Sequence, residues 1–494
     1  MNRYLLEKLR KGICIAFIMG AMMTVYITLL TRLDAYAAEE IGRNIIVYID
    51  GDQGHDVKAI DVAYDHNEYV SLRDMAASLK GTQKEFSLSI DSEWVDITKG
   101  GVYSILPTDN QKWTEEGISR LAKSYFTNTM IRVDGEEVRY YINYDSSANG
   151  INEPYIMLVD LCMLLDMDIS VTPEGVIRIS TTDKFNADIQ SLEFAGYLQG
   201  VNSVLVGDAS TGTIFYEYRG SEAFPIASTT KLMTSAIVFD YLSEGKIKMT
   251  DSVPISAKVE KLSNEVDGVI KMTAGKTATL EDLLYGALLP SSNESALCLA
   301  EYVAGDEASF VEKMTEKAKS LGMETAIFYN CNGLPFFGKA IVPVKKHNRM
   351  SSEDMFKLCS YIINNHQDML DITSTKVTRL SSFGGKEVKN TNGVLYNLPG
   401  TTGLKTGTTN KAGACLVTSY NMKVDGENHD IVAVLFGAES SQDRIRVSEL
   451  LLRYGIDVLN GDAPSYVGTV ESSSKELPTS AEGIIECVLS GVRG

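Results

Sequence analysis

Three short motifs follow one another along this chain, and any fold it adopts has to accommodate all three. Residues 228–231 read Ser-Thr-Thr-Lys, residues 291–293 read Ser-Ser-Asn, and residues 405–407 read Lys-Thr-Gly. Each motif alone is a weak signal, because S-x-x-K occurs by chance in many chains of 494 residues. The ordered set, with each motif in a fitting local setting, is a strong one. It predicts a single site assembled from three distant segments.

The first motif pairs a hydroxyl with an amine. The stretch 229–242 has helical periodicity, so Ser228 lies at the first turn of a helix and Lys231 on the same face one turn on. A serine hydroxyl is a poor nucleophile until a base within hydrogen-bond reach takes its proton. Lysine is such a base only if desolvation or a nearby cation lowers its pKa, and Lys405 is the natural second cation. The helix amino end would favour a forming oxyanion.

The second motif follows an apolar helix predicted over residues 280–289 and ended by Pro290. In an extended segment or a tight turn, Ser291 and Asn293 point to one side and Ser292 to the other. A hydroxyl and an amide on that side could relay a proton and hold a substrate backbone.

The third motif lies between Pro-Gly-Thr-Thr-Gly at 399–403 and an apolar stretch at 414–418. This pattern predicts a β-strand whose edge can pair with an extended peptide. Lys405 would supply positive charge there, and the glycines would allow close backbone approach. Two further strands, at 203–206 and 213–216, are predicted to form a hairpin.

Composition excludes several classes of function. The chain has 46 Lys+Arg against 65 Asp+Glu, a formal charge of −19 that argues against nucleic acid as a partner. Seven cysteines are scattered without C-x-x-C spacing, so we expect small buried residues rather than a zinc site or a disulfide framework. His347, His366 and His429 lie in polar stretches and are predicted to be solvated. No metal or cofactor motif is recognised.

The amino end has the features of a targeting segment. Four basic residues precede an uncharged apolar run at 13–30, and Ala-Tyr-Ala at 35–37 offers a cleavage site. The run is long for a signal peptide and just long enough to span a bilayer, so residues 1–37 are either removed or kept as a membrane anchor. In both cases the remainder is expected to work outside the cytoplasm, in the cell wall or at the outer face of the membrane.

Residues 38–185 form a separate region that contains a degenerate internal repeat. The stretch 69–79 matches 155–165 in pattern, each an extended entry followed by a helix, and strand-like stretches follow at 94–97 and 176–179. This pattern resembles the small α+β modules called copper amine oxidase N-terminal-like domains. No metal is expected despite that name, and the region is expected to be a spacer or wall-contacting domain.

Residues 189–457 resemble the low-molecular-weight penicillin-binding proteins, specifically the serine-type D-alanyl-D-alanine carboxypeptidases. Beyond the three motifs, the resemblance extends to residues 225–234, 289–305, 318–323, 332–334 and 444–455. It implies a β-lactamase/DD-peptidase-like α/β (α+β) fold, with a central antiparallel sheet and helices, for a catalytic domain at 186–457. Residues 458–494 would be a C-terminal tail, too short for the extra β-rich domain and amphipathic helix of many members.

The resemblance also implies roles for individual residues. Ser228 would attack the carbonyl between the last two D-alanines of a peptidoglycan stem peptide, with Lys231 as base and Ser291 passing a proton to the leaving group. β-Lactam antibiotics would acylate the same serine. The remaining residues of the implied site bind substrate: Asn293 and Lys405, with Thr406, Gly407, Thr408 and Arg444. The amides of Ser228 and Thr408 would form the oxyanion hole, and Arg444 would bind the terminal carboxylate, although Arg446 is close by.

Three other functions remain open. The same acyl-transfer machinery would serve a DD-endopeptidase that cuts peptide crosslinks. A class A β-lactamase shares all three motifs but needs a glutamate that activates the deacylating water, and none stands in the expected setting between 294 and 400. A non-catalytic wall-binding protein would have no use for a lysine one helical turn from a serine. Ser292, at the centre of the second motif, departs from the glycine or aspartate often found there.

Overall fold

The computed structural model describes residues 42–51, 54–61, 68–91, 94–107, 109–110, 112, 129–145, 153–172, 175–190, 196–198, 200–265, 269–337 and 345–466. The predicted targeting segment at 1–37 and the tail beyond 466 lie outside these residues. In the described part of the chain, no helix has both the length and the apolar character needed to cross a bilayer. The five cysteines described there are all buried and free, as predicted: Cys162, Cys298, Cys331, Cys359 and Cys415.

The first of two large sheets is built from residues 42–180 and has ten strands. Their order is β4-β5-β6-β7-β8-β3-β2-β1-β10-β9, and all neighbours are antiparallel except β5 with β6 and β1 with β10. We call this region the N-terminal module. Its strands are β1 (Gly42–Ile49), β2 (His55–Asp61), β3 (Glu68–Ser71), β4 (Phe86–Ile90), β5 (Trp94–Lys99), β6 (Thr129–Val133), β7 (Glu136–Asp145), β8 (Glu153–Met157), β9 (Asp168–Val171) and β10 (Ile177–Ser180).

The predicted internal repeat is confirmed as two strand–helix units lying side by side. In the first copy β3 leads directly into α2 (Leu72–Ser78), and in the second β8 leads into α4 (Leu158–Leu165). The two entry strands pair antiparallel, with Tyr69 opposite Met157. All eight residues of α4 are buried, including the carboxylate-bearing Asp160. A buried carboxylate in an apolar helix needs a partner, and that partner comes from the other end of the chain.

The second large sheet has five antiparallel strands in the order β12-β11-β23-β22-β21. It confirms the predicted central antiparallel sheet and the predicted hairpin of β11 and β12. The third motif lies on β21, which is an edge strand, as the sequence predicted. The bounds are β11 (Ser203–Asp208), β12 (Thr213–Tyr218), β21 (Thr401–Thr409), β22 (Gly413–Val424) and β23 (Glu427–Ala438).

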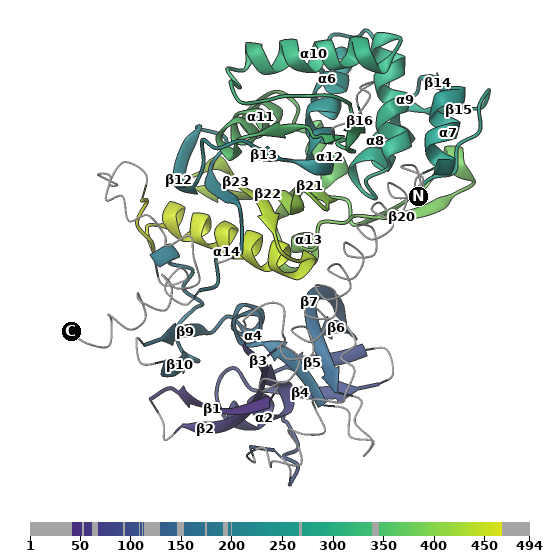
Figure 1. Ribbon diagram of the computed structural model, residues 1–494. Coiled ribbons are helices and arrows are strands. Elements are labelled where there is room, and N and C mark those ends of the chain that lie inside the picture. The colour runs from purple at the N-terminus through teal and green to yellow at the C-terminus, as the bar shows by residue number, and fades with distance from the viewer. Residues whose placement is uncertain are drawn as a thin grey trace, which may run out of the picture.

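This sheet is the middle layer between two sets of helices (Figure 1). One face is covered by α14 (Ser441–Asn460), which packs on β22 and β23. The other face is covered by α11 and by the helical part of the molecule. The helices on that side are α6 (Lys231–Ser243), α7 (Ala257–Glu265), α8 (Leu280–Leu288), α9 (Asn293–Ala304), α10 (Glu307–Ser320), α11 (Ser352–Asn365) and α12 (Asp368–Thr373).

Short elements connect these layers. Four two-stranded ribbons pair β13 with β18, β14 with β15, β16 with β17, and β19 with β20. The remaining bounds are β13 (Phe224–Pro225), η1 (Ala227–Thr230), β14 (Ser252–Pro254), β15 (Thr277–Thr279), β16 (Phe336–Phe337), β17 (Lys345–Lys346), β18 (Arg349–Met350), β19 (Val377–Leu380), η2 (Ser381–Phe383), β20 (Lys386–Lys389) and α13 (Val394–Asn397).

The alternation of side chains along the central strands divides the interior into two cores. On β23, Ile431, Ala433 and Leu435 join the core beneath α14, whereas Val432 and Val434 join the core beneath the helical layer. Successive residues of a strand point to opposite faces, so each central strand contributes to both. The core beneath α14 also contains the apolar residues of the N-terminal module, so the module and the central sheet share one hydrophobic interior.

Charged and polar side chains reinforce this shared interior. Arg446 of α14 contacts Asp160 of α4 through Nε at 2.8 Å and Nη2 at 3.4 Å, and both side chains are almost fully buried. The hydroxyl of Tyr140 on β7 donates to Glu449 of α14 at 2.7 Å. Arg453, one turn further on, bonds Glu449 at 2.9 Å. In Figure 1, α14 lies between the module and the central sheet, and the contacts of Arg446 with Asp160 and of Glu449 with Tyr140 fix it to the module.

Candidate active site

The turn that carries Ser228 is held in place by its own side chains and by the close approach of β21. Ser228 lies in η1, just ahead of α6, after Ala227 with a left-handed φ of 45°. The Thr229 hydroxyl donates to the carbonyl of Ile226 at 2.6 Å. A Cβ on Gly407 would lie 2.9 Å from the Ser228 nitrogen, so a glycine is required where β21 passes the serine.

Lys231 brings the first two motifs together. Its Nζ lies 2.8 Å from Ser228 Oγ, 2.8 Å from Asn293 Oδ1 and 3.4 Å from Ser291 Oγ. It also donates to the backbone carbonyl of Asn332 at 2.9 Å. The predicted serine–lysine geometry is therefore present in the structure, one helical turn apart.

Burial makes Lys231 suitable as a base. The side chain is fully buried, and desolvation lowers its pKa to about 7, against smaller opposing effects of Cys331 and Glu294. The ordinary pKa of lysine lies near 10.5, at which the amine would stay protonated in neutral solution. With a pKa of about 7, a large fraction of Lys231 is neutral and able to accept the proton of Ser228.

The second motif is a tight turn between α8 and α9. Ser291 has a φ of 67°, and from this turn Ser291 and Asn293 both face Lys231. Ser292 points the other way and caps α9, its Oγ accepting from the amide of Ser295 at 2.9 Å. The predicted split between the two sides is confirmed. The serine at the centre of the motif has a structural role as a helix cap.

Lys405 adds a second buried cation to the site. It lies on β21 with 1% of its surface exposed, and its Nζ donates to the carbonyl of Thr406 at 2.9 Å. Its pKa is lowered well below the ordinary value, first by burial and then by the charges of Lys231 and Arg444. The expectation that Lys405 is the second cation near Lys231 agrees with this environment.

Arg444 and Arg446 lie two residues apart on α14 and point to different places. Arg444 Nη1 donates to Thr408 Oγ1 at 3.0 Å and lies 3.5 Å from the carbonyl of Gly407. Its Nε is buried and has no hydrogen-bond partner within the described chain. Arg446 instead binds Asp160 in the N-terminal module. The helix phase that the sequence left undetermined thus brings Arg444, and not Arg446, to the strand of the third motif.

Sequence reasoning missed the contribution of the segment around Asn332. The carbonyl of Asn332 accepts from Lys231 and lies 3.4 Å from Ser228 Oγ. A Cβ on the following Gly333 would collide with the carbonyl of Ala227 at 1.9 Å. The buried Asn348 holds this turn through Asn330, with Nδ2 to the Asn330 carbonyl at 2.9 Å. A backbone carbonyl carries no side-chain signature, and the resemblance at residues 332–334 marked the segment without giving it a role.

The prediction that His366 is solvated is wrong. His366 is 4% exposed, and its Nε2 lies 2.9 Å from Asp240 Oδ1. Asp240 on α6 also bonds the Tyr361 hydroxyl and pairs with Lys317 at 2.7 Å. These interactions hold α6, the helix that carries Lys231, against α10 and α11. The polar residues around His366 in the sequence therefore mark a buried cluster and not a surface loop.

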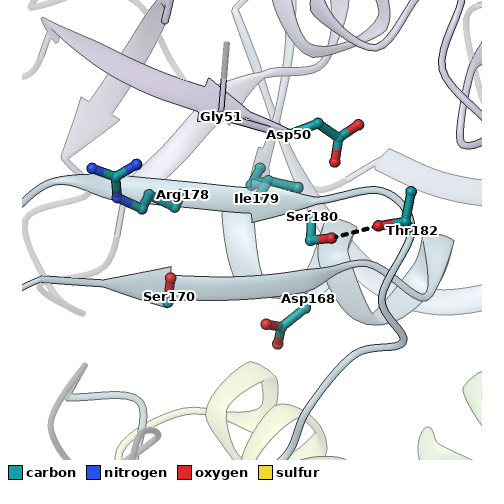
Figure 2. Close-up of a pocket in the computed structure, with 8 residues that line it drawn as sticks. All are labelled: Asp50, Gly51, Asp168, Ser170, Arg178, Ile179, Ser180 and Thr182. Atoms are coloured by element: carbon teal, nitrogen blue, oxygen red, sulfur yellow. Dashed lines mark hydrogen bonds between the residues drawn. The ribbon is translucent and has the colours of Figure 1, made fainter.

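A polar hollow in the N-terminal module lies outside this site (Figure 2). Asp168 and Ser170 come from β9, and Arg178, Ile179 and Ser180 come from β10. The carboxylate of Asp50, which also lines the hollow, accepts two hydrogen bonds from Thr181, one from its amide at 2.8 Å and one from its hydroxyl at 2.6 Å. Asp50 thus joins the end of β1 to the segment that follows β10.

Comparison with known proteins identifies the part of the chain that holds this geometry. The family model "Peptidase_S11: D-alanyl-D-alanine carboxypeptidase" matches residues 199–440. The D-alanyl-D-alanine carboxypeptidase DacF of Bacillus subtilis is 30% identical over 244 residues, covering 49% of this chain and 58% of the relative. DacC of Escherichia coli is 30% identical over 255 residues, covering 50% and 59%. The chain thus spans about three fifths of the length of these two relatives.

Other relatives are matched over more of their length. Penicillin-binding protein D2 of Listeria monocytogenes, solved in an ampicillin-bound form, is 26% identical with a TM-score of 0.45, covering 52% of this chain and 97% of that one. The D-alanyl-D-alanine endopeptidase of Pseudomonas aeruginosa is 31% identical over 263 residues, covering 52% of this chain and 77% of the relative. Because the family model matches residues 199–440 and this relative is 31% identical over 77% of its own length, the chain belongs to the Peptidase_S11 family of D-alanyl-D-alanine carboxypeptidases.

Proposed function

We propose that this protein is a serine-type D-alanyl-D-alanine carboxypeptidase that trims the terminal D-alanine from peptidoglycan stem peptides through an acyl-enzyme. The observation that carries the proposal is the 2.8 Å contact between Ser228 Oγ and a buried Lys231 whose pKa is lowered to about 7. A lysine that is neutral at physiological pH and touches a serine hydroxyl provides the base that such a nucleophile needs.

The reaction begins with acylation of the serine. Ser228 Oγ attacks the carbonyl carbon between the last two D-alanines while its proton passes to the neutral Lys231. The amides of Ser228 and Thr408 stabilise the negative charge on the carbonyl oxygen, and the close approach of Gly407 to the Ser228 nitrogen supports this role. The carbon–nitrogen bond then breaks, and D-alanine leaves with a proton that Lys231 returns through Ser291. Water hydrolyses the ester and regenerates Ser228.

Substrate binding uses the cations on the other side of the site. The terminal carboxylate of the peptide is bound by Lys405, Thr406 and Arg444, because a guanidinium binds a carboxylate through two parallel hydrogen bonds. The unpartnered Nε of Arg444 leaves donor capacity for this purpose. Asn293 and the free edge of β21 hold the peptide backbone in an extended form. β-Lactam antibiotics occupy the same positions and acylate Ser228.

An endopeptidase acting on peptide crosslinks is the second candidate. It is favoured by the relative from Pseudomonas aeruginosa, whose name is D-alanyl-D-alanine endopeptidase. A β-lactamase is disfavoured by the surroundings of the nucleophile. Among the residues that the structure describes, no carboxylate forms a hydrogen bond with Ser228 or Lys231, so none is placed to activate a deacylating water there.

The setting of the reaction follows from the substrate. We place the protein outside the cytoplasm, in contact with the cell wall or the outer face of the membrane, where peptidoglycan lies. Residues 1–37 would direct it there, residues 38–185 would form the accompanying copper amine oxidase N-terminal-like module, residues 186–457 the catalytic domain, and residues 458–494 the tail.

The test uses residues 38–494 with a fluorescent penicillin and with diacetyl-Lys-D-Ala-D-Ala. Stable labelling that disappears in Ser228→Ala, together with release of D-alanine, is the expected result. Rapid turnover of the drug without D-alanine release would make the protein a β-lactamase. Cleavage of crosslinked peptides in preference to the diacetyl peptide would make it an endopeptidase, and no reaction at all would leave a wall-binding protein.

A further inference from the structure

Two segments that border the nucleophile contain no acidic residues, although the chain as a whole carries a formal charge of −19. There is no Asp or Glu between Glu324 and Glu353, or between Glu387 and Asp425. The first segment supplies the Asn332 carbonyl at Ser228, and the second supplies β21. A positive potential is therefore concentrated beside the site in an otherwise acidic protein.

The first segment reaches the site by a short ribbon. From the turn at Asn332 the chain runs into β16, which pairs with β17 so that Phe336 lies opposite Lys346. It returns along β18, where Arg349 lies opposite Pro225, three residues before Ser228. The amide of Ile226 also donates to the carbonyl of Asn348 at 3.1 Å. Residues 345–349 are therefore held against the strand that leads into the nucleophile.

The exposed surface of this ribbon combines an aromatic face with cations. Phe336 is 41% exposed and stacks on Tyr329, with ring centroids 6.2 Å apart. Lys346 Nζ lies 5.1 Å from the centre of the Tyr329 ring, so its amine is held over the aromatic pair. Neither Phe336 nor Lys346 has a role in the reaction described above.

The second segment adds a cation from the end of β21. Lys411 lies in the turn between β21 and β22 and is exposed. The Sγ of Cys415 lies 3.6 Å from the Ala412 carbonyl in this turn and 3.9 Å from the carbonyl of Pro225, which pairs with Arg349, so the turn lies close to the ribbon. In agreement with this, burial first and then the charges of Lys345 and Lys411 lower the pKa of His347. Within the described residues, no carboxylate forms an ion pair with Lys346 or Lys411. We call Phe336, Lys346, His347, Arg349 and Lys411 the cationic rim.

The direction of β21 places the rim on one particular side of the substrate. Lys405, which faces the terminal carboxylate in the proposed function, precedes Gly407, and Lys411 follows it. A peptide extended along this edge therefore directs its upstream residues toward Lys411. From Gly407 to the end of the strand at Thr409 is about 7 Å, the length of two extended residues. In a stem pentapeptide, the γ-linked glutamyl residue lies two residues upstream of the D-alanine that is attacked.

We propose that the cationic rim binds the free α-carboxylate of this glutamyl residue, so that the enzyme prefers anionic stem peptides to those in which that carboxyl is amidated. The inference rests on the proposed function and names its substrate class. Lys346 and Lys411 supply the charge, and Phe336 with Tyr329 supplies an apolar face for the peptide chain. Because the cations are exposed, the preference decreases as salt is added.

The experiment compares L-Ala-γ-D-Glu-L-Lys-D-Ala-D-Ala with the same peptide carrying γ-D-isoglutamine, by measuring kcat/KM for release of D-alanine. We expect the wild type to favour the anionic peptide by about fivefold to tenfold, the range for two exposed ion pairs. In the double variant Lys346→Met, Lys411→Met the two peptides should become equal. Methionine keeps the unbranched stem and removes the charge.

Two controls separate this effect from others. The double variant Lys319→Met, Lys423→Met removes the same two charges from exposed positions elsewhere and should keep the preference. Labelling of Ser228 by penicillin and cleavage of diacetyl-Lys-D-Ala-D-Ala, which lacks the glutamyl residue, should be unchanged in both double variants. Equal kcat/KM for the two pentapeptides in the wild type, or the same loss for both in the rim variant, would overturn the inference while penicillin labelling and D-alanine release upheld the proposed function. Absence of both reactions would overturn the proposed function and the inference together.

Discussion

Two groups of cations, all buried except the partly exposed Arg453, lie on either side of α14, and they are held in opposite ways. On the side of the active site, Lys231, Lys405 and Arg444 have hydroxyl, amide and carbonyl partners, and burial lowers the pKa of each. On the side of the N-terminal module, Arg446 and Arg453 bond to carboxylates. Burial is the largest single effect and lowers their pKa values as well, but the neighbouring acidic and hydroxyl groups, chiefly Asp160 and Glu449, together raise both values above that of an ordinary arginine, so both arginines stay charged.

The difference separates groups that do chemistry from groups that hold the fold. A buried cation without a carboxylate is costly, and it releases its proton readily or attracts an anion from solution. Those two properties are what a base and a carboxylate-binding group need. A buried cation that is paired with a carboxylate is neither basic nor available to a ligand, and its contribution is to fix one helix against another. The following predictions test this contrast.

The largest effect is expected from the base. Lys231→Met should reduce acylation of Ser228 by penicillin by about 10³-fold, because the serine loses the group that takes its proton. The rate of labelling, followed with a fluorescent penicillin in stopped flow, measures this. Labelling at the rate of the wild type would show that another group is the base.

Lys405→Met should change activity and stability in opposite directions. We expect kcat/KM to fall by about 10²-fold to 10³-fold, as for other groups that stabilise charge in a transition state. The free energy of unfolding at pH 7 should rise by about 1 kcal/mol, because an unpaired buried charge is replaced by an apolar side chain of similar length.

The pH dependence of the stability gained in Lys405→Met has a defined sign. The pKa of Lys405 in the folded protein lies well below 10.5, the value expected in the unfolded protein. At pH values between these two, the unfolded protein therefore carries a proton on Lys405 that the folded protein has released. The stability of the wild type therefore rises with pH across that window. The advantage of the methionine variant should shrink accordingly, and urea denaturation at several pH values measures it. A Lys405→Met variant less stable than the wild type at pH 7 would contradict the proposed difference between buried cations without and with a carboxylate partner.

Asp160→Asn should lower the free energy of unfolding, whereas Lys405→Met should raise it. Removal of this carboxylate leaves Arg446 buried with only Asp443 as a charged partner, and we expect a loss of about 3 kcal/mol in the free energy of unfolding. Acylation by penicillin below the melting range should stay close to that of the wild type. Arg379, exposed and paired with Glu387, is the matched control, because Arg379→Gln should change stability by less than about 1 kcal/mol.

The smallest expected effect is the pH profile of the wild type. With a Lys231 pKa of about 7, the rate constant for acylation should be level above that pH and fall about tenfold for each unit below it. The neutral amine is the active form, so the rate rises with pH and does not decline. A profile that is flat from pH 5 to pH 8 would show that Lys231 is not the titrating base.

The contact between Ser228 and Lys231 was predictable from the sequence because it is local. Ser228 and Lys231 are three residues apart, and a single helical turn is enough to bring them together. The choice of Arg444 over Arg446 could not be made in the same way, because it depends on where Asp160 lies, 286 residues away. One signal was present: Asp160 is the lone charge in an apolar stretch that forms the buried helix α4. It indicated that this helix faces a cation.

The shared core also revises the expected role of the N-terminal module. A spacer would be joined to the catalytic part by a linker and few contacts. Instead, its apolar residues continue into the interior beneath α14, and Tyr140 bonds to Glu449 across 309 residues of sequence. Periodicity identified the strands and helices of the module correctly, but it gives no information on which of their faces meets another part of the chain.

The pairing of the module with α14 has a consequence for how the protein is made. The module is synthesised early, yet the helix that covers its apolar face is formed by residues 441–460. A polypeptide that crosses a membrane amino end first would present this uncovered face for as long as the rest of the chain is still being delivered. Contacts between residues so far apart in sequence form slowly, and exposed apolar surface attracts other chains in the meantime. The module's apolar face is therefore fully covered only once residues 441–460 are present, so residues 42–180 and α14 mature as one unit.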